Sequence, residues 1–232
     1  YLNKKEMKRR AYERIKQVGS YGVLHYGETK FFDDRKFSNQ ENIFKYRIST
    51  IKVFMGENNL ILGVQAFYKD LQDKEYPGAE GRDKAINELD IKRLDIPPND
   101  FLCNLNIWTG DDDIRKLKFG TKKGKELVVG NEDGEDRIID CVNGNKDHII
   151  LSISGGYRST LELMSFKYIP INEYLGPIIG YFELRLKLKN EEFKKRTEQI
   201  INKLPDSDKV LFRVCCLPND DCFYEIIKFC LY

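Results

Sequence analysis

Short apolar segments alternate with turn residues through most of the chain, from residue 22 to residue 170. Arg47–Phe54 and Leu60–Tyr68 flank a turn at Gly56–Asn59 and predict a long hairpin, and the polar stretch Lys69–Lys84 predicts an inserted loop. Further strands are predicted at Ile86–Leu94, Leu102–Thr109, Ile114–Thr121, Glu126–Gly130, Ile138–Cys141, Ile149–Ser154 and Thr160–Tyr168. Many short strands at regular intervals indicate an all-β domain.

The segment before this domain has a helical pattern. Lys4–Gln17 is highly charged, and Gly19 would end the helix. Apolar residues follow one another at spacings of three and four: Met7, Ala11, Ile15 and Val18. We therefore predict an amphipathic helix or arm over residues 1–21. Met7, Ala11 and Ile15 would dock this arm either on its own domain or on a partner protein.

The region from 171 to 232 has a different rhythm. Tyr181–Lys189 is typical of a strand and Glu191–Leu204 of a helix, after which Lys209–Cys216 and Cys222–Leu231 form two short apolar runs. This order predicts a small α+β extension at the C-terminal end.

Composition and charge exclude several classes of function. The chain has 232 residues, of which 41% are hydrophobic and 33% charged, and 39 basic residues nearly balance 37 acidic ones. A net charge of +2 does not indicate the excess of basic residues that nucleic-acid binding requires. No apolar run approaches the roughly 20 residues that a membrane helix needs, so we expect no membrane insertion. Because no secretory signal is visible, a cytoplasmic location is expected.

The six cysteines, at positions 103, 141, 215, 216, 222 and 230, form no Cys-x-x-Cys pair. We therefore predict no zinc site, and no other metal or cofactor. Cys103 and Cys141 lie within apolar strand patterns, which favours buried thiols in a reducing compartment. The cluster from Cys215 to Cys230 would form disulfides if the protein were secreted.

Three segments together resemble the jacalin-like lectin family. Tyr26–Asp34 is similar to the glycine-containing start and the aromatic-Asp-Asp sequence of that family, and Ile150–Tyr157 with Leu161–Phe166 is similar to its closing hairpin. The resemblance covers about residues 22–169. It implies a β-prism, in which three four-stranded antiparallel sheets of Greek-key strands surround a pseudo-threefold axis. It also implies metal-free binding of galactose- or mannose-type sugars.

The family's sugar site combines backbone amides from two loops with one aspartate carboxylate. The resemblance assigns the loops to Gly27 and to a run that ends at the carboxylate position, Glu162. The residues of that run are Gly155, Gly156, Tyr157, Arg158 and Ser159. Glu162 departs from the family aspartate by one methylene, which moves the carboxylate by about 1 Å, enough to weaken a hydrogen-bonded site. Glu28 stands where the family has a second glycine, so its side chain would crowd the pocket.

Two functional hypotheses follow. The first is a non-catalytic structural protein, a subunit of a larger assembly that its terminal extensions hold in place. The alternative is a lectin that uses the loops at Gly27–Lys30 and Gly155–Glu162. An enzyme is not expected, because the only two imidazoles, His25 and His148, neighbour no Ser or Cys nucleophile in the sequence.

Overall fold

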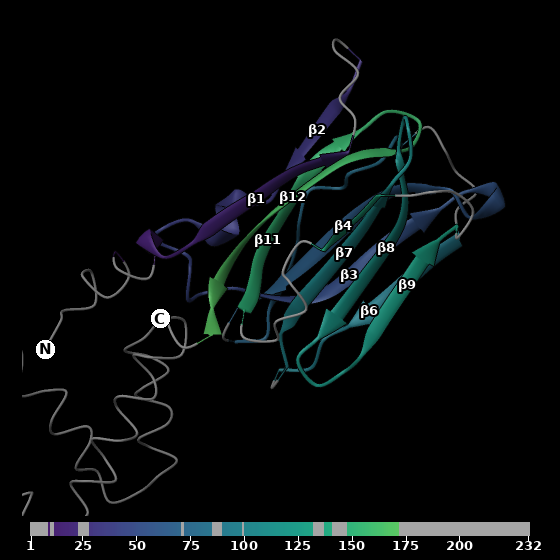
Figure 1. Cartoon of the computed structure of the whole chain (residues 1–232). Coiled ribbons are helices and arrows are strands. Elements are labelled where there is room, and N and C mark those ends of the chain that lie inside the picture. Colours follow the sequence, from purple (N-terminus) through teal and green to yellow (C-terminus); the bar gives the residue numbers. More distant parts are fainter. Residues whose placement is uncertain are drawn as a thin grey trace, which may run out of the picture.

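In the computed structural model, the described residues are 9, 12–22, 28–70, 72–84, 90–98, 100–131, 137–140 and 148–171. Within them, twelve strands form three four-stranded sheets, and every pair of neighbouring strands is antiparallel (Figure 1). This arrangement is the β-prism that the resemblance implies. Predictions made for Met7, Ala11, Gly27 and residues 172–232 lie outside the described residues.

The twelve strands form three sheets, and the described chain begins and ends in the first of them. The first sheet contains β1 (Lys16–Gly22), β12 (Leu161–Pro170), β11 (His148–Tyr157) and β2 (Lys30–Asp33) in that order. The second contains β10 (Arg137–Asp140), β7 (Leu102–Thr109), β8 (Ile114–Thr121) and β9 (Glu126–Gly130). The third contains β5 (Glu75–Pro77), β4 (Ile61–Lys69), β3 (Arg47–Met55) and β6 (Asp90–Asp95). Two short 3₁₀ helices, η1 (Arg35–Ser38) and η2 (Glu57–Asn59), connect strands.

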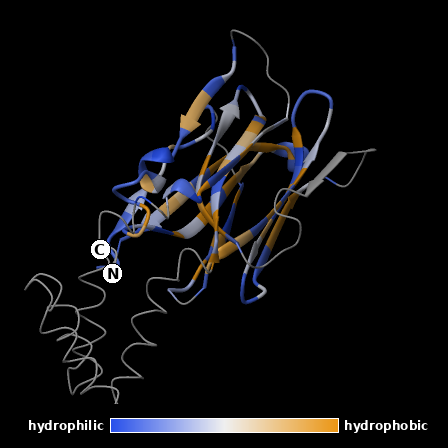
Figure 2. Ribbon diagram, turned by 60° about the vertical axis from the view of Figure 1, so that its left-hand side comes forward, coloured by the Kyte–Doolittle hydropathy of each residue, from blue (hydrophilic) through white to orange (hydrophobic). Residues whose placement is uncertain are grey.

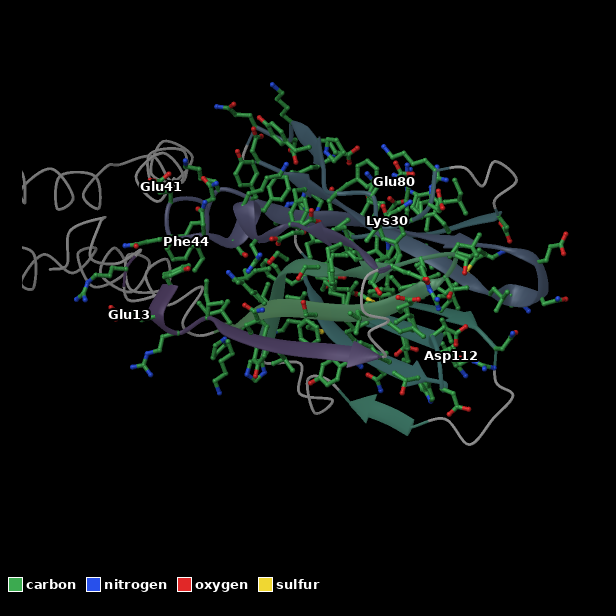
Figure 3. All side chains as sticks on the ribbon, turned by 90° about the horizontal axis from the view of Figure 1, so that it is seen from above. Glu13, Lys30, Glu41, Phe44, Glu80 and Asp112 are labelled. Atoms are coloured by element: carbon green, nitrogen blue, oxygen red, sulfur yellow. The ribbon has the colours of Figure 1, made fainter. Side chains whose placement is uncertain are left out.

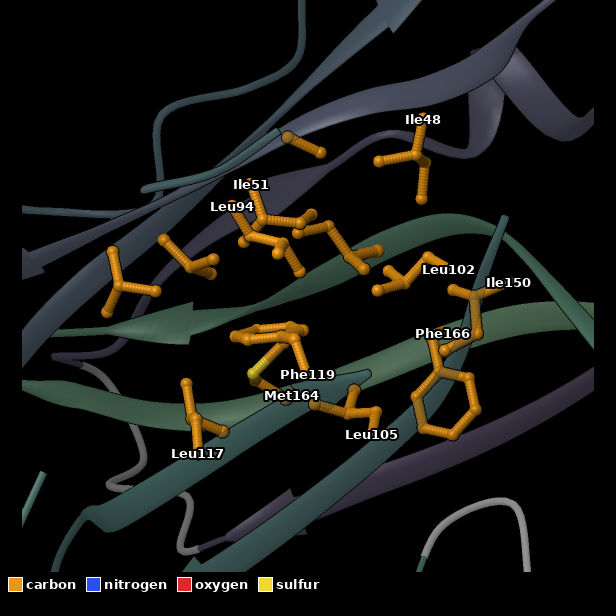
Figure 4. Close-up of a cluster of buried hydrophobic side chains, with 14 of the residues drawn as sticks. Ile48, Ile51, Leu94, Leu102, Leu105, Leu117, Phe119, Ile150, Met164 and Phe166 are labelled. Carbon is orange, nitrogen blue, oxygen red and sulfur yellow. The ribbon is translucent and has the colours of Figure 1, made fainter. Parts of the chain in front are cut away.

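The core fills the space between the three sheets (Figure 4). On β7, Leu105 and Ile107 are completely buried while the alternate residues Asn104 and Asn106 are partly exposed, because successive side chains of a strand point to opposite faces. Side chains from all three sheets meet there, including Ile51, Val64, Leu117, Phe119, Met164 and Phe166. The apolar positions gather on the inner side of the ribbon and the polar ones on loops and outer faces (Figure 2).

Most of the predicted strands are confirmed. β7, β8 and β9 have the predicted bounds, and the hairpin β3–β4 differs from its prediction by a residue at three of its four ends. The predicted loop Lys69–Lys84 was wrong in one respect, since it contains the short strand β5. β5 pairs with the end of β4, where Tyr68 lies opposite Tyr76.

The helix predicted to run to Gln17 was wrong at its C-terminal end. Lys16–Gly22 is strand β1, which pairs with β12 at the edge of the first sheet. The prism therefore begins six residues before the predicted boundary at 22. Gly19 and Gly22 have φ of +108° and +120°, and the register shifts between Val18 and Tyr21. The glycine that was interpreted as a helix stop instead lets an irregular edge strand follow β12 closely.

Of the three predicted docking residues, Ile15 is described, and it packs on its own domain. It contacts a second apolar cluster, made of Ile43, Phe44, Ile149, Leu151 and Ile169. All five residues of that cluster are buried. At Ile15, therefore, the N-terminal segment covers the prism.

A buried carboxyl group joins the first and third sheets. Asp34, directly after β2, is completely buried. It accepts hydrogen bonds from the Tyr68 hydroxyl at 2.9 Å and from the Ala79 N–H at 2.7 Å. Burial raises the pKa of Asp34 to about 6, because loss of hydration penalises the charged form more than these two bonds stabilise it.

Candidate functional site

The predicted sugar site lies where the β11–β12 turn meets the segment before β2. Tyr157, the last residue of β11, pairs with Leu161 on one side and with Lys30 on the other. The turn is tight, with the Arg158 N–H donating to the Thr160 carbonyl at 3.0 Å. Figure 3 shows the side chains from above, with Lys30 marking the edge strand beside this turn. The geometry brings Glu28 and Thr29 next to Arg158 and Glu162.

Glu162 is buried in this corner. Its side chain is 0% exposed, although it is a carboxylate. One carboxylate oxygen accepts from the Thr29 hydroxyl at 2.7 Å, and the other accepts from Arg158 Nε at 2.6 Å. These charge-assisted bonds offset the loss of hydration, so the buried carboxylate is fixed and paired.

Arg158 links the buried carboxylate to an exposed one. Its Nη1 donates to a Glu28 carboxylate oxygen at 3.0 Å. The Arg158 side chain is 35% exposed, whereas that of Glu28 is 68% exposed. Hydrogen bonds to Glu28 and Glu162 raise the pKa of Arg158 above its ordinary value. Its Nη2 has no hydrogen-bond partner among the described residues and can donate to a ligand.

The remaining predicted site residues have mainly structural positions. Gly155 and Gly156 lie within β11, and a Cβ atom on Gly156 would come within 2.6 Å of Thr29 Cγ2. A glycine there lets the Thr29 hydroxyl reach Glu162. Tyr157 is half-buried and packs on the core, while Ser159 at the turn is exposed.

Sequence reasoning brought Arg158, Glu162 and the loop Gly27–Lys30 into one site, but it gave Thr29 no role of its own. It also interpreted Glu28 as a side chain that would crowd the pocket, whereas the structure pairs it with Arg158. Thr29 and Glu162 are 133 positions apart, so no local pattern could have joined them. In the structure the Glu162 carboxylate contacts Arg158 and Thr29 inside the corner and is not exposed to solvent.

In the part of the chain that the structure describes, no cluster of three or more His, Cys, Asp or Glu side chains could hold a metal ion. The described helices are all too short or too polar to cross a membrane. Cys103 is a buried thiol, 3.7 Å from the Gly120 carbonyl oxygen. Burial there agrees with the prediction for Cys103.

Comparisons with known proteins identify the fold. No family model and no curated protein matches the sequence. Artocarpin in complex with mannotriose is 18% identical, with 67% of this chain and 97% of artocarpin covered and a TM-score of 0.50. AcmJRL, a mannose-binding jacalin-related lectin from Ananas comosus, is 16% identical over 67% and 98% of the two chains, with a TM-score of 0.50. Calystegia sepium agglutinin is 14% identical over 67% and 96%, with a TM-score of 0.51. About two thirds of the chain therefore has the fold of the jacalin-related lectins.

Proposed function

We propose that this jacalin-like β-prism is a non-catalytic carbohydrate-binding module, and that its sugar site is the corner formed by Glu28, Thr29, Arg158 and Glu162. The observation that carries the proposal is the outward-facing Arg158–Glu28 pair, held in place by a buried carboxylate. The fold supports it, because artocarpin forms a complex with mannotriose and AcmJRL binds mannose.

The chemistry of the corner suits sugar hydroxyls. A guanidinium donates and a carboxylate accepts, and both make hydrogen bonds stronger than those of neutral groups. Arg158 has a further donor group, Nη2, with no partner among the described residues, and Glu28 is largely exposed. In this site Glu162 is a positioning residue, which fixes Arg158. Glu28 and Arg158 would therefore bind the sugar hydroxyls, a role that the resemblance assigned to the carboxylate of Glu162.

The test is a glycan array of the intact protein, followed by titration calorimetry with methyl mannoside and methyl galactoside. Arg158→Gln should abolish binding of whichever sugar is bound, since it removes the charge and most of the donors. Arg93→Gln is the matched control, because Arg93 forms a comparable pair with Asp95 on the exposed face of β6. If the intact protein bound no glycan of the array, the proposal would be refuted. Equal sugar binding by the wild type and Arg158→Gln would also refute it.

A second candidate function is that of a subunit in a larger assembly. The observation that favours it is the exposure of Phe31. This residue lies on the edge strand β2 and is 68% exposed. An exposed aromatic on an edge strand is a common site of strand addition by a partner. If this function holds, Phe31→Ser should release the protein from its complex in sedimentation of native lysate. An unchanged sedimentation profile would argue against β2 as the contact.

A further inference from the structure

A second concave site lies away from the Arg158 corner. It is an open hollow of about 420 Å³, lined by Lys36, Phe37, Asn42, Tyr46, Tyr76 and Pro77. These residues come from η1, from the loop that follows it and from β5. Its volume is within the range of small-molecule sites, roughly 300–1,000 Å³. None of the residues that line it is acidic.

Three aromatic rings form the wall of the hollow, and they meet nearly at right angles. The planes of Phe37 and Tyr46 make an angle of 79°, with their centroids 5.2 Å apart. Tyr46 and Tyr76 make an angle of 84° at 5.4 Å. Perpendicular rings present faces and edges to the same space, so they can contact a flat ring ligand from two sides.

The wall is rigid. Phe37 stacks on the completely buried Tyr68 at 3.9 Å and 12°, which anchors it to the core. The Tyr76 hydroxyl donates to Asp70 Oδ2 at 2.9 Å. That carboxylate also accepts the N–H groups of Gln72 and Lys74, so its charge is engaged in the turn. A site whose walls are already fixed loses less entropy when it binds a ligand.

Ammonium groups surround the aromatic wall. Lys36 Nζ lies 4.9 Å from the centre of the Phe37 ring, and Lys74 Nζ lies 5.3 Å from that of Tyr76. Lys45 Nζ donates to Asn42 Oδ1 at 3.1 Å, which brings a third ammonium beside the hollow. The protein's own lysines thus already occupy the positions over the rings that a cationic ligand would take. The charge around the hollow favours an anion.

We propose that this hollow binds an acidic sugar unit, a pyranose that carries a carboxylate or a sulfate group. The pyranose would lay its C–H face on Tyr46, the ring of the wall over which no described ammonium group lies, and Asn42 would bond its hydroxyls. Lys36, the only charged residue of the lining, would pair with the acidic group. The site is distinct from the Arg158 corner, so it gives the molecule a second point of contact with one glycan.

The test uses the full chain and three probes: methyl glucuronide, methyl galactoside 6-sulfate and uncharged methyl glucoside. Saturation-transfer NMR and calorimetry should detect the two acidic sugars, and the glucoside should bind about tenfold more weakly because it lacks the charge-assisted bond. Lys36→Gln should remove that difference. Lys116→Gln is the matched control, since Lys116 lies 5.1 Å over the Trp108 ring on the second sheet.

Ring variants and the Arg158 variant separate this site from the corner. Tyr46→Leu should lose binding of all three probes, while Tyr46→Phe should keep it, with near-ultraviolet circular dichroism confirming that both variants fold. Arg158→Gln should bind the acidic sugars like the wild type. If Arg158→Gln loses them and Lys36→Gln does not, acidic sugars bind at the corner, and the hollow is refuted while the proposed function stands. Equal affinity for all three probes would also overturn the inference.

Discussion

Asp34 makes the stability of the prism depend on pH. Burial raises its pKa to about 6 in the folded chain, whereas an unfolded aspartate titrates near 3.9. Between these two values the folded state binds the extra proton, so stability falls as the pH rises through this window and is constant above it. The two pKa values differ by about 2, which corresponds to roughly 3 kcal/mol.

Asp34→Asn removes this titration and keeps the size of the side chain. The difference in free energy of unfolding, wild type minus variant, should be roughly 2–3 kcal/mol larger at pH 4 than at pH 7. Urea denaturation of both proteins at the two pH values measures it, and the shared carboxylates cancel in the difference. A difference that is the same at both pH values would show that Asp34 does not carry the effect.

The Arg158–Glu162 ion pair should stabilise the folded state more than an ordinary surface ion pair does, because Glu162 is completely buried. A double-mutant cycle with Arg158→Gln and Glu162→Gln measures their coupling. We expect about 1–2 kcal/mol, which allows for the partial exposure of Arg158. The same cycle on Arg93 and Asp95, with side chains 52% and 61% exposed, should give about 0–0.5 kcal/mol. Equal couplings in the two cycles would mean that the corner is an ordinary surface pair.

At the scale of elements, β1 depends on glycine where it approaches β12. Gly22 has φ of +120°, and a Cβ there would overlap the Glu162 carbonyl oxygen. Gly124 in the β8–β9 turn has φ of +91° but nothing within 4 Å of such a Cβ. Gly124→Ala should therefore cost only backbone strain, about 1 kcal/mol, and Gly22→Ala should cost at least about 3 kcal/mol by urea denaturation. Similar losses would mean that β1 can shift away from β12 without penalty.

The sequence predicted those strands whose partners are close along the chain. Strands that are consecutive in the sequence pair with each other in the hairpin β3–β4 and in the series β7, β8 and β9. The apolar pattern and the turn residues between them therefore define these strands. β1 pairs with β12, about 140–150 residues away, and the spacing of Ile15 and Val18 at its start fits a helix equally well. The contact between Glu162 and Thr29 escaped prediction for the same reason, because the two residues lie 133 positions apart. The resemblance located the corner, and only the long-range pairing shows which groups in it face outward.

At the scale of the whole molecule, the first sheet closes the prism. It joins β1 and β2 from the start of the domain to β11 and β12 from its end, while the other two sheets are each built from one continuous stretch (Figure 1). β12 is a central strand of the first sheet, and β1 covers one of its sides. Ile15 beside β1 also covers the cluster around Ile149 and Ile169. The N-terminal segment thus protects both a strand edge and an apolar surface.

Deletion of residues 1–22 should therefore do more than remove one strand. It would leave β12 as an edge whose backbone N–H and C=O groups can pair with another chain, and exposed strand edges lead to aggregation. We expect the deletion variant to melt at a lower temperature and to form oligomers in light scattering at concentrations where the full chain is uniform. Ile15→Ser, which keeps β1 but weakens its apolar contact, should lower the melting temperature without oligomers. A deletion variant that stays as uniform as the full chain would show that the edge of β12 is protected by something other than β1.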